Sequence, residues 1–119
     1  MSAMLNVVID EEKHQTNPNI ILVENVLETL QILANFHRKH LSIPVISLTG
    51  SNGKTIVKEW LNFLLSPEYT IIRSPKSYNS QVGVPLSVIA INEQHNLGIF
   101  EAGISTVSEM EKLEPIIRP

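Results

Sequence analysis

The chain has 119 residues, which is the length of one small domain. Its hydrophobic content of 43% and charged content of 18% are ordinary for a globular protein, and its net charge of −3 argues against a nucleic-acid-binding protein with a basic surface. No apolar stretch is long enough to span a bilayer, and no basic segment followed by an apolar one indicates a signal peptide. Because the chain also has no cysteine, disulfides and thiol catalysis are excluded, and we expect a cytoplasmic protein.

Two short strands and one helix are expected in the first 40 residues. The segments 5–9 and 20–23 are short and apolar, which favours strands, and the polar segment 10–19 between them contains turn-forming Asn and Pro. From residue 24 to about residue 40, apolar residues recur near helical spacing, and Asn25 stands where a helix N-cap is expected. The succession of strands and helices here differs from that in the rest of the chain. We therefore predict that residues 1 to about 40 belong to a preceding domain or form a linker helix.

From residue 43 onward, strands and helices are expected to alternate. The strands are predicted at 43–48, 69–72 and 97–100, and the helices at 56–65, 85–91 and 106–114. Such alternation implies βαβ units with a parallel sheet, so the predicted fold class is α/β. Trp60, Phe63 and Leu64 share helical spacing and are expected in the core. Ser105 or Thr106 is expected to cap the last helix.

Residues 49–55, Thr-Gly-Ser-Asn-Gly-Lys-Thr, connect a predicted strand to a predicted helix. Glycines in such a turn let the backbone approach an anion, so that several main-chain N–H groups converge on it. The helix that follows adds its free N-terminal N–H groups and the positive end of its dipole. Lys54 can then reach terminal phosphates, and the Thr55 hydroxyl can bind Mg²⁺. The segment therefore predicts a phosphate-binding loop.

The match is to a compact form of the phosphate-binding loop. The strict eight-residue pattern has its first glycine five positions before Gly53, where this chain has Leu48, so Gly50 serves as the first turn glycine. A Gly-Lys-Thr triplet also occurs in ordinary loops, and the alternative is a helix N-terminus with a solvated lysine. The flanking strand and helix favour phosphate binding.

Polar residues also follow the two later strands. In an open parallel sheet, ligands bind outside the C-terminal ends of the strands. Glu101 stands at the end of the strand 97–100, two strands away from the phosphate loop, where a carboxylate is well placed to hold the magnesium ion of a nucleotide. The alternative is a solvated loop glutamate. The loop 74–85 is dense in hydrogen-bonding side chains, which suit a binding loop and a plain turn-rich loop equally well.

Three segments together resemble the successive signatures of the central domain of Mur ligases: residues 49–55, residues 77–85 (Ser-Tyr-Asn-Ser-Gln-Val-Gly-Val-Pro) and residues 101–103 (Glu-Ala-Gly). Mur ligases are ATP-dependent enzymes that form amide bonds in the synthesis of peptidoglycan precursors. The second segment most resembles the family member that adds D-alanyl-D-alanine to UDP-N-acetylmuramoyl-tripeptide, including the form fused ahead of an alanine racemase domain in some bacteria. The resemblance covers roughly residues 20–119.

The resemblance implies ATP and Mg²⁺ as cofactors and suggests a role for each matching residue. The phosphates of ATP would be bound by Gly50, Ser51, Asn52, Gly53, Lys54 and Thr55. Thr55 and Glu101 would hold Mg²⁺, and Lys54 would be catalytic because its charge would act on the charge that develops during phosphoryl transfer. The residues near the UDP-linked substrate or the γ-phosphate would be Asn79, Ser80 and Gln81. Ser51 stands where Mur ligases often carry threonine, and both side chains have a hydroxyl.

The resemblance also implies a domain organisation. Residues 1–40 would be the end of an N-terminal substrate-binding domain with its linker helix, and residues 41–119 would be the N-terminal part of the ATP-binding central domain. We therefore expect a fragment of a ligase that acts on UDP-N-acetylmuramoyl-tripeptide and D-alanyl-D-alanine. Alone it would be inactive, and an exposed sheet edge or apolar face would make it self-associate.

Two other functions stay open at this point. One is another ATP-dependent ligase of the Mur or folylpolyglutamate type, which would share the phosphate loop and differ in its substrate loop. The other is a P-loop nucleotide-binding module without ligase activity. The order of Asn79, the Gly-Val-Pro segment and Glu101 along the chain favours the ligase.

Overall fold

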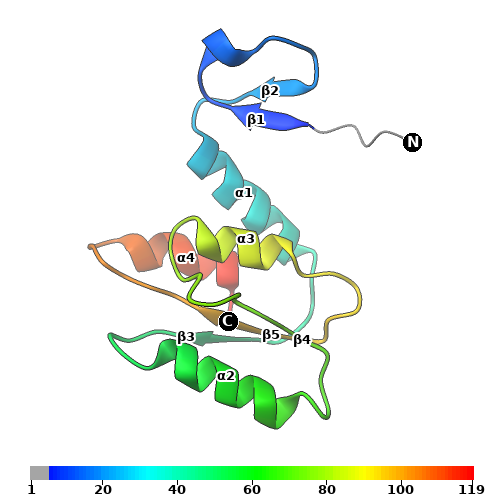
Figure 1. Cartoon of the computed structure of the whole chain (residues 1–119), viewed down its shortest axis with the longest axis vertical. Helices are drawn as coiled ribbons and strands as arrows, with labels where there is room; N and C mark the ends of the chain where they lie inside the picture. Colours follow the sequence, from blue (N-terminus) through cyan, green and yellow to red (C-terminus); the bar gives the residue numbers. More distant parts are fainter. Residues whose placement is uncertain (1–5) are drawn as a thin grey trace.

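A small two-stranded sheet stands at one end of the molecule (Figure 1). The structure, a computed structural model, describes residues 6–119, so Leu5 of the predicted first strand lies outside the described residues. β1 (Val7–Ile9) and β2 (Ile20–Leu22) pair in parallel, and the 3₁₀ helix η1 (Glu12–His14) lies between them in the chain. Both strands predicted in this region are present, and each is shorter than expected.

Helix α1 (Val26–Lys39) leads from this small sheet to the rest of the molecule. Asn25 caps the helix as predicted, because its side-chain oxygen accepts a hydrogen bond of 2.8 Å from the Glu28 N–H. α1 packs against α3 (Gly83–Ile89) and α4 (Glu109–Ile117), and β1 and β2 lie beyond its N-terminal end (Figure 1). The domain boundary after residue 40 stays a prediction.

Three parallel strands form the main sheet, in the order β3 (Val45–Leu48), β5 (Leu97–Glu101), β4 (Ile71–Arg73). β5 is the central strand, and all its residues are buried. The predicted α/β fold with a parallel sheet is therefore confirmed. Because Leu48 pairs with Glu101, the carboxylate lies one strand away from the end of β3 in the sheet, not two as predicted from the order along the chain.

Helices cover both faces of the main sheet (Figure 1). α2 (Lys54–Leu65) covers one face, and α1, α3 and α4 cover the other. The core lies on the side of the three helices and includes Val84, Val88, Phe100, Leu113 and Ile116. Among residues 6–119, no helix is long and apolar enough to cross a membrane.

The start of α4 differs from the prediction. The helix begins at Glu109 rather than at residue 106, and it continues through Pro115. Ser105 and Thr106 are not its caps: their main-chain N–H groups instead donate hydrogen bonds of 2.5 and 2.9 Å to the Glu109 carboxylate. These bonds, chiefly the one from Ser105, hold the pKa of the Glu109 carboxyl below its ordinary value because they stabilise its charged form.

α2 turns its aromatic residues outward, which contradicts their predicted place in the core. Trp60, Phe63 and Leu64 are 67%, 78% and 68% exposed, whereas Lys58 on the same helix is fully buried. Helical spacing showed correctly that the three apolar residues share a face. It could not show that the opposite face, carrying Lys58, packs on the sheet.

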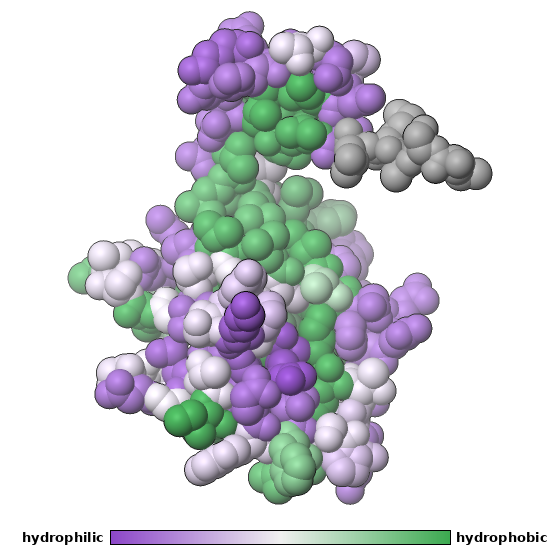
Figure 2. Space-filling view, in the orientation of Figure 1, coloured by the Kyte–Doolittle hydropathy of each residue, from purple (hydrophilic) through white to green (hydrophobic). Residues whose placement is uncertain are grey.

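Apolar side chains also lie at the surface of the small sheet and of α1. Figure 2 shows this apolar surface over β1, β2 and the adjoining helix, where Ile21, Ile32 and Phe36 are each at least half exposed. Exposed apolar side chains that gather in one region are typical of a surface that other polypeptide covers.

Arg38 joins distant parts of the chain through its guanidinium. The residue is 7% exposed and donates hydrogen bonds of 2.8 to 3.2 Å to the carbonyl oxygens of Leu41, Ile43, Ile117 and Arg118. Burial, with a contribution from the charge of Arg118, lowers the pKa of Arg38, although a guanidinium stays charged at neutral pH. Arg38 therefore holds the C-terminal end of α1 to the end of α4 and to the chain entering β3.

We expect Arg38→Met to lower the free energy of unfolding by about 3 kcal/mol, because buried carbonyl oxygens lose their donor. Chemical denaturation of the purified variant measures this change. Lys39→Met is the matched control, since Lys39 is exposed and its loss should change the free energy by less than about 0.5 kcal/mol. Equal stability of the two variants would show that the Arg38 bonds do not hold the helices together.

Candidate functional site

The loop after β3 has a backbone shape that suits an anion. Gly50 and Gly53 have φ angles of 132° and 84°, a region where a side chain would be strained. Gly53 is the N-cap of α2, which therefore begins at Lys54, two residues before its predicted start. The N–H groups of the first helical turn have no partner within the helix, and the positive end of the helix dipole lies at the same place.

The charge of Lys54 lies across this loop. Its ammonium donates a hydrogen bond of 2.5 Å to the carbonyl oxygen of Gly50, four residues earlier. Thr55 follows in the same helical turn, so a cation and a hydroxyl stand side by side with the free N–H groups. The residues predicted to bind phosphate thus form one continuous turn.

The carboxylate of Glu101 lies beside the Thr55 hydroxyl. Thr55 Oγ1 donates a hydrogen bond of 2.9 Å to Glu101 Oε1, and the Glu101 side chain is completely buried. The Glu101 N–H donates to Ser74 Oγ at 2.9 Å, which ties the end of β5 to the end of β4. The structure therefore brings together the two residues predicted to bind Mg²⁺, and their role in metal binding stays a prediction.

Lys58, which the sequence analysis missed, holds the other oxygen of the same carboxylate. Its ammonium lies 2.8 Å from Glu101 Oε2, and its side chain is fully buried. It also donates hydrogen bonds to the carbonyl oxygens of Ser74, at 2.7 Å, and of Lys76. The available signal was a lysine four residues after Lys54 and so on the same side of the helix, which does not by itself distinguish a buried lysine from a solvated one.

Asn79 is held against the segment that follows Glu101. The Gly103 N–H donates a hydrogen bond of 2.6 Å to the Asn79 carbonyl oxygen. A Cβ atom on Gly103 would lie 2.7 Å from Asn79 Oδ1 and 3.0 Å from the Asn79 carbonyl oxygen, so any larger residue would displace the Asn79 side chain. The second and third predicted segments therefore meet at this pair of residues.

Ser80 and Gln81 have hydrogen-bond partners within the chain. Ser80 Oγ accepts a bond of 3.0 Å from the Gly83 N–H at the start of α3. Gln31 Nε2 donates to the Gln81 carbonyl oxygen and to Gln81 Oε1 at 3.2 and 3.1 Å, and Gln81 Nε2 donates to the Glu109 carbonyl oxygen at 3.4 Å. These contacts connect the loop to α1 and α4, and the predicted role in substrate binding stays a prediction.

Two adjoining cavities contain all the residues predicted for the site. One has a volume of about 290 Å³ and is lined by Ser51, Asn52, Gly53, Lys54, Thr55, Ile56, Asn79 and Glu101. The second, of about 390 Å³, shares Ser51, Lys54 and Asn79 with the first and adds Gly50, Ser80 and Gln81. The phosphate loop and the second loop therefore face a common space.

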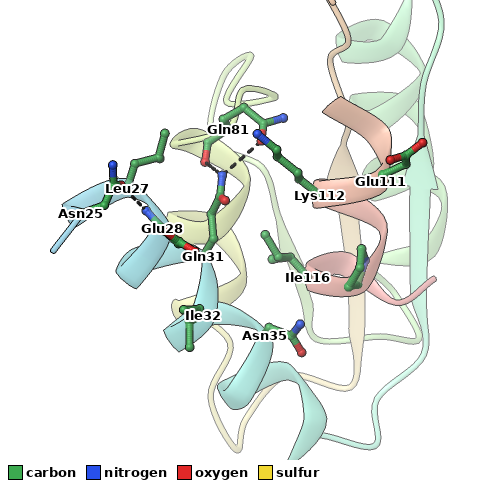
Figure 3. A pocket seen from close by; sticks show the side chains of 11 residues that line it. Asn25, Leu27, Glu28, Gln31, Ile32, Asn35, Gln81, Glu111, Lys112 and Ile116 are labelled. Carbon is green, nitrogen blue, oxygen red and sulfur yellow. Dashed lines mark hydrogen bonds between the residues drawn. The ribbon is translucent and has the colours of Figure 1, made fainter. Parts of the chain in front are cut away.

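A larger groove, of about 560 Å³, lies between α1 and α4 (Figure 3). The hydrogen bond from Gln31 to Gln81 lies at one end of the groove, and Asn35 on α1 lines the groove further along the helix. Within the described residues, Asn35 Oδ1 is buried without a hydrogen-bond partner. The groove has no turn of converging N–H groups, so we place the candidate site at the phosphate loop despite its smaller cavities.

The donor atoms at Thr55 and Glu101 suit a magnesium ion. Mg²⁺ prefers oxygen ligands and is usually bound by one or two carboxylates together with phosphate oxygens and waters. A hydroxyl and a carboxylate oxygen, hydrogen-bonded to each other, both belong to residues that line the smaller cavity. Residues 6–119 contain no group of three or more His, Cys, Asp or Glu side chains that could hold a metal alone. A cation here would therefore complete its shell with phosphate oxygens and water.

Comparison with protein families and curated proteins gives consistent matches. The family model of the Mur ligase middle domain matches residues 48–119. The UDP-N-acetylmuramoyl-tripeptide–D-alanyl-D-alanine ligase of Borreliella burgdorferi is 39% identical over 99 residues, which are 83% of this chain and 21% of that protein. The ligase of the same name from Bacillus subtilis is 34% identical over 103 residues, covering 87% of this chain and 22% of that protein.

Solved structures show the same relationship. A MurF ligase from Thermotoga maritima in complex with ADP has a TM-score of 0.82 and 28% identity, covering 93% of this chain and 26% of that one. A MurF structure from Acinetobacter baumannii has a TM-score of 0.80 and 28% identity, covering 84% and 22%. The chain spans about a fifth of the length of the curated relatives it matches. Because the model of the middle domain matches residues 48–119, which are more than half of the chain, this chain belongs to the Mur ligase family.

Proposed function

We propose that this chain forms the nucleotide-binding part of an ATP-dependent ligase that adds D-alanyl-D-alanine to UDP-N-acetylmuramoyl-tripeptide. The observation that carries the proposal is the meeting of the phosphate loop, the Thr55–Glu101 pair and Asn79 at adjoining cavities. The names of the two curated relatives and the ADP complex of the Thermotoga maritima protein support it. Peptidoglycan synthesis and a cytoplasmic location belong to the same proposal.

In this proposal the main-chain N–H groups of residues 50–55 bind the phosphates of ATP. They suit this task because they are fixed before the ligand arrives and gain from the helix dipole. The Lys54 ammonium, which is bonded to the Gly50 carbonyl oxygen within the loop, stabilises the negative charge that develops on the transferred phosphoryl group. Lys54 is thus the residue to which we assign a catalytic role.

Thr55 and Glu101 are the residues that would hold Mg²⁺. A magnesium ion bound there supplies positive charge next to the phosphates. The chain's own contribution is to keep a hydroxyl and a carboxylate oxygen 2.9 Å apart at the cavity wall, with the carboxylate shielded from solvent. A preorganised pair needs little rearrangement when the nucleotide binds.

The reaction proposed for the complete ligase has two steps. A carboxylate of the tripeptide attacks the γ-phosphate of ATP, which releases ADP and forms an acyl phosphate. The amine of D-alanyl-D-alanine then displaces inorganic phosphate and forms the amide bond. Asn79 is the best placed of the predicted substrate residues, because it lines both cavities while Ser80 and Gln81 line only the second.

The proposed domain division follows the resemblance. Residues 1–40 would end the N-terminal substrate-binding domain and include the linker helix α1, and residues 41–119 would begin the ATP-binding domain. The hydrogen bonds from Gln31 on α1 to Gln81 would then connect the two domains next to the site. The UDP-linked substrate would approach the second loop from that side.

Nucleotide binding tests the central part of the proposal. We expect the chain to bind ADP in the presence of Mg²⁺ and Lys54→Met to weaken this binding at least about tenfold, because a charge-assisted contact to phosphate is lost. Isothermal titration calorimetry measures both affinities. Lys112→Met, which removes an exposed lysine from α4, should change the affinity less than about twofold. The proposal is wrong if the unaltered chain does not bind the nucleotide, or if Lys54→Met binds it equally well.

The polypeptide of these 119 residues is expected to have no ligase turnover alone. It spans about a fifth of its curated relatives, and its phosphate loop with the Thr55–Glu101 pair supplies only the phosphate side of the reaction. The measurement is phosphate release in a mixture of ATP, UDP-N-acetylmuramoyl-tripeptide and D-alanyl-D-alanine. Release that requires all three compounds would refute this expectation.

Self-association through α2 is a further part of the proposal. Trp60, Phe63 and Leu64 form an exposed apolar face, which a second copy can cover. We expect light scattering to show dimers or larger species, and the double variant Trp60→Glu/Phe63→Glu to be monomeric. Val107→Glu is the control, because Val107 is 94% exposed and lies outside α2. A monomeric unaltered chain would contradict this idea.

A further inference from the structure

Lys58 is a buried lysine that lies behind the wall of the nucleotide cavity. Its side chain and that of Glu101 are both 0% exposed, and only Glu101 of the two lines the cavity. Lysine is rarely buried completely unless its charge is paired, because removing an ammonium from water is costly. The groups that pair with the Lys58 ammonium therefore indicate its role.

We propose that Lys58 is a positioning residue of the nucleotide site, which fixes both the Glu101 carboxylate and the turn after β4 relative to α2. The inference rests on the proposed nucleotide-binding function. Lys58 acts through these neighbours, and it does not itself touch the nucleotide.

The first task of Lys58 is to orient the carboxylate. Glu101 Oε2 accepts its hydrogen bond at 2.8 Å, while Glu101 Oε1 accepts the bond from Thr55 at 2.9 Å. Thr55 and Lys58 lie three residues apart on α2 and so face the same side. With one oxygen engaged by each residue, the carboxylate cannot rotate, and Oε1 stays at the cavity wall beside the Thr55 hydroxyl.

The second task is to hold the start of the second loop. The Lys58 ammonium donates to the carbonyl oxygens of Ser74, at 2.7 Å, and of Lys76. Lys76 has a φ of 50°, a conformation that is uncommon for residues with a side chain. A bond from a buried ammonium to this residue favours the turned backbone. Asn79 follows three residues later, so the position of this turn sets where Asn79 meets the phosphate loop.

All three N–H bonds of the ammonium are used in this arrangement. They reach the end of β5, the end of β4 and the turn that follows β4, while the lysine itself belongs to α2. An ammonium has three donors and no acceptor, so this set of carbonyl and carboxylate oxygens satisfies it completely. Methionine has a similar length and no donor, and it would lose every one of these contacts.

The test compares Lys58→Met with Leu113→Ala. Leu113 is fully buried in α4, so its variant is destabilised by lost packing while the site contacts stay in place. Two quantities are measured on the folded chain. One is the ADP affinity with and without Mg²⁺, and the other is amide hydrogen exchange of residues 76–82.

We expect Mg²⁺ to raise the ADP affinity of the unaltered chain. In Lys58→Met this increase should be about tenfold smaller, because the carboxylate is no longer held beside Thr55. Exchange of residues 76–82 should become at least about tenfold faster than in Leu113→Ala of similar melting temperature. The proposal is overturned if the two variants agree in both measurements, since Lys58 would then contribute stability only.

A second variant keeps the test usable if Lys58→Met does not fold. Lys58→Met/Glu101→Gln removes both buried charges and should recover stability, because neither charge is left unpaired. Its residues 76–82 should still exchange at least about tenfold faster than in the unaltered chain, since the anchor of the turn is missing. Exchange at the unaltered rate would overturn the proposal. If the unaltered chain does not bind ADP, the proposed function fails, and the exchange measurement still decides the role of Lys58.

Discussion

A buried carboxylate is the constraint on which the site depends. Glu101 is completely removed from water, so its charge is tolerable only because α2 supplies a hydroxyl and an ammonium to its two oxygens. The Glu101 N–H is also engaged, by Ser74 Oγ. Thr55 and Lys58 on α2, Ser74 after β4 and Glu101 on β5 therefore have to be in place together, which fixes the position of α2 on the sheet.

The order of the strands explains how these groups meet. β5 lies between β3 and β4, although it follows both in the chain. The end of β5 is therefore next to the phosphate loop on one side and next to the start of the second loop on the other. Gly103 then allows Asn79 to approach from the second loop. In open parallel sheets, ligands bind at the C-terminal ends of the strands, at the point where the strand order reverses. Both cavities lie at this end of the main sheet.

Much of this could be predicted from local patterns, and the failures have a common cause. The glycine spacing of residues 49–55, the Asn25 cap and the alternation of strands and helices depend on neighbours in the chain, so the sequence shows them. The distance from Glu101 to β3 depends on strand order, and the burial of Lys58 depends on which face of α2 packs on the sheet; both are tertiary features that local patterns do not contain. Trp60 was misplaced for the same reason, because its spacing defines a face of α2 and not what covers that face.

α2 packs a mixed face on the sheet, because Thr55 and Lys58 lie there together with the half-buried Leu61 and Leu65. Its inward side supplies Thr55 and Lys58 to Glu101, while Trp60 and Phe63 face away from the sheet. Since the phosphate loop, the strand paired with β5 and the groups bonded to Glu101 all lie within residues 45–101, the phosphate side of the site takes its shape within this segment, whatever covers the outer face of α2.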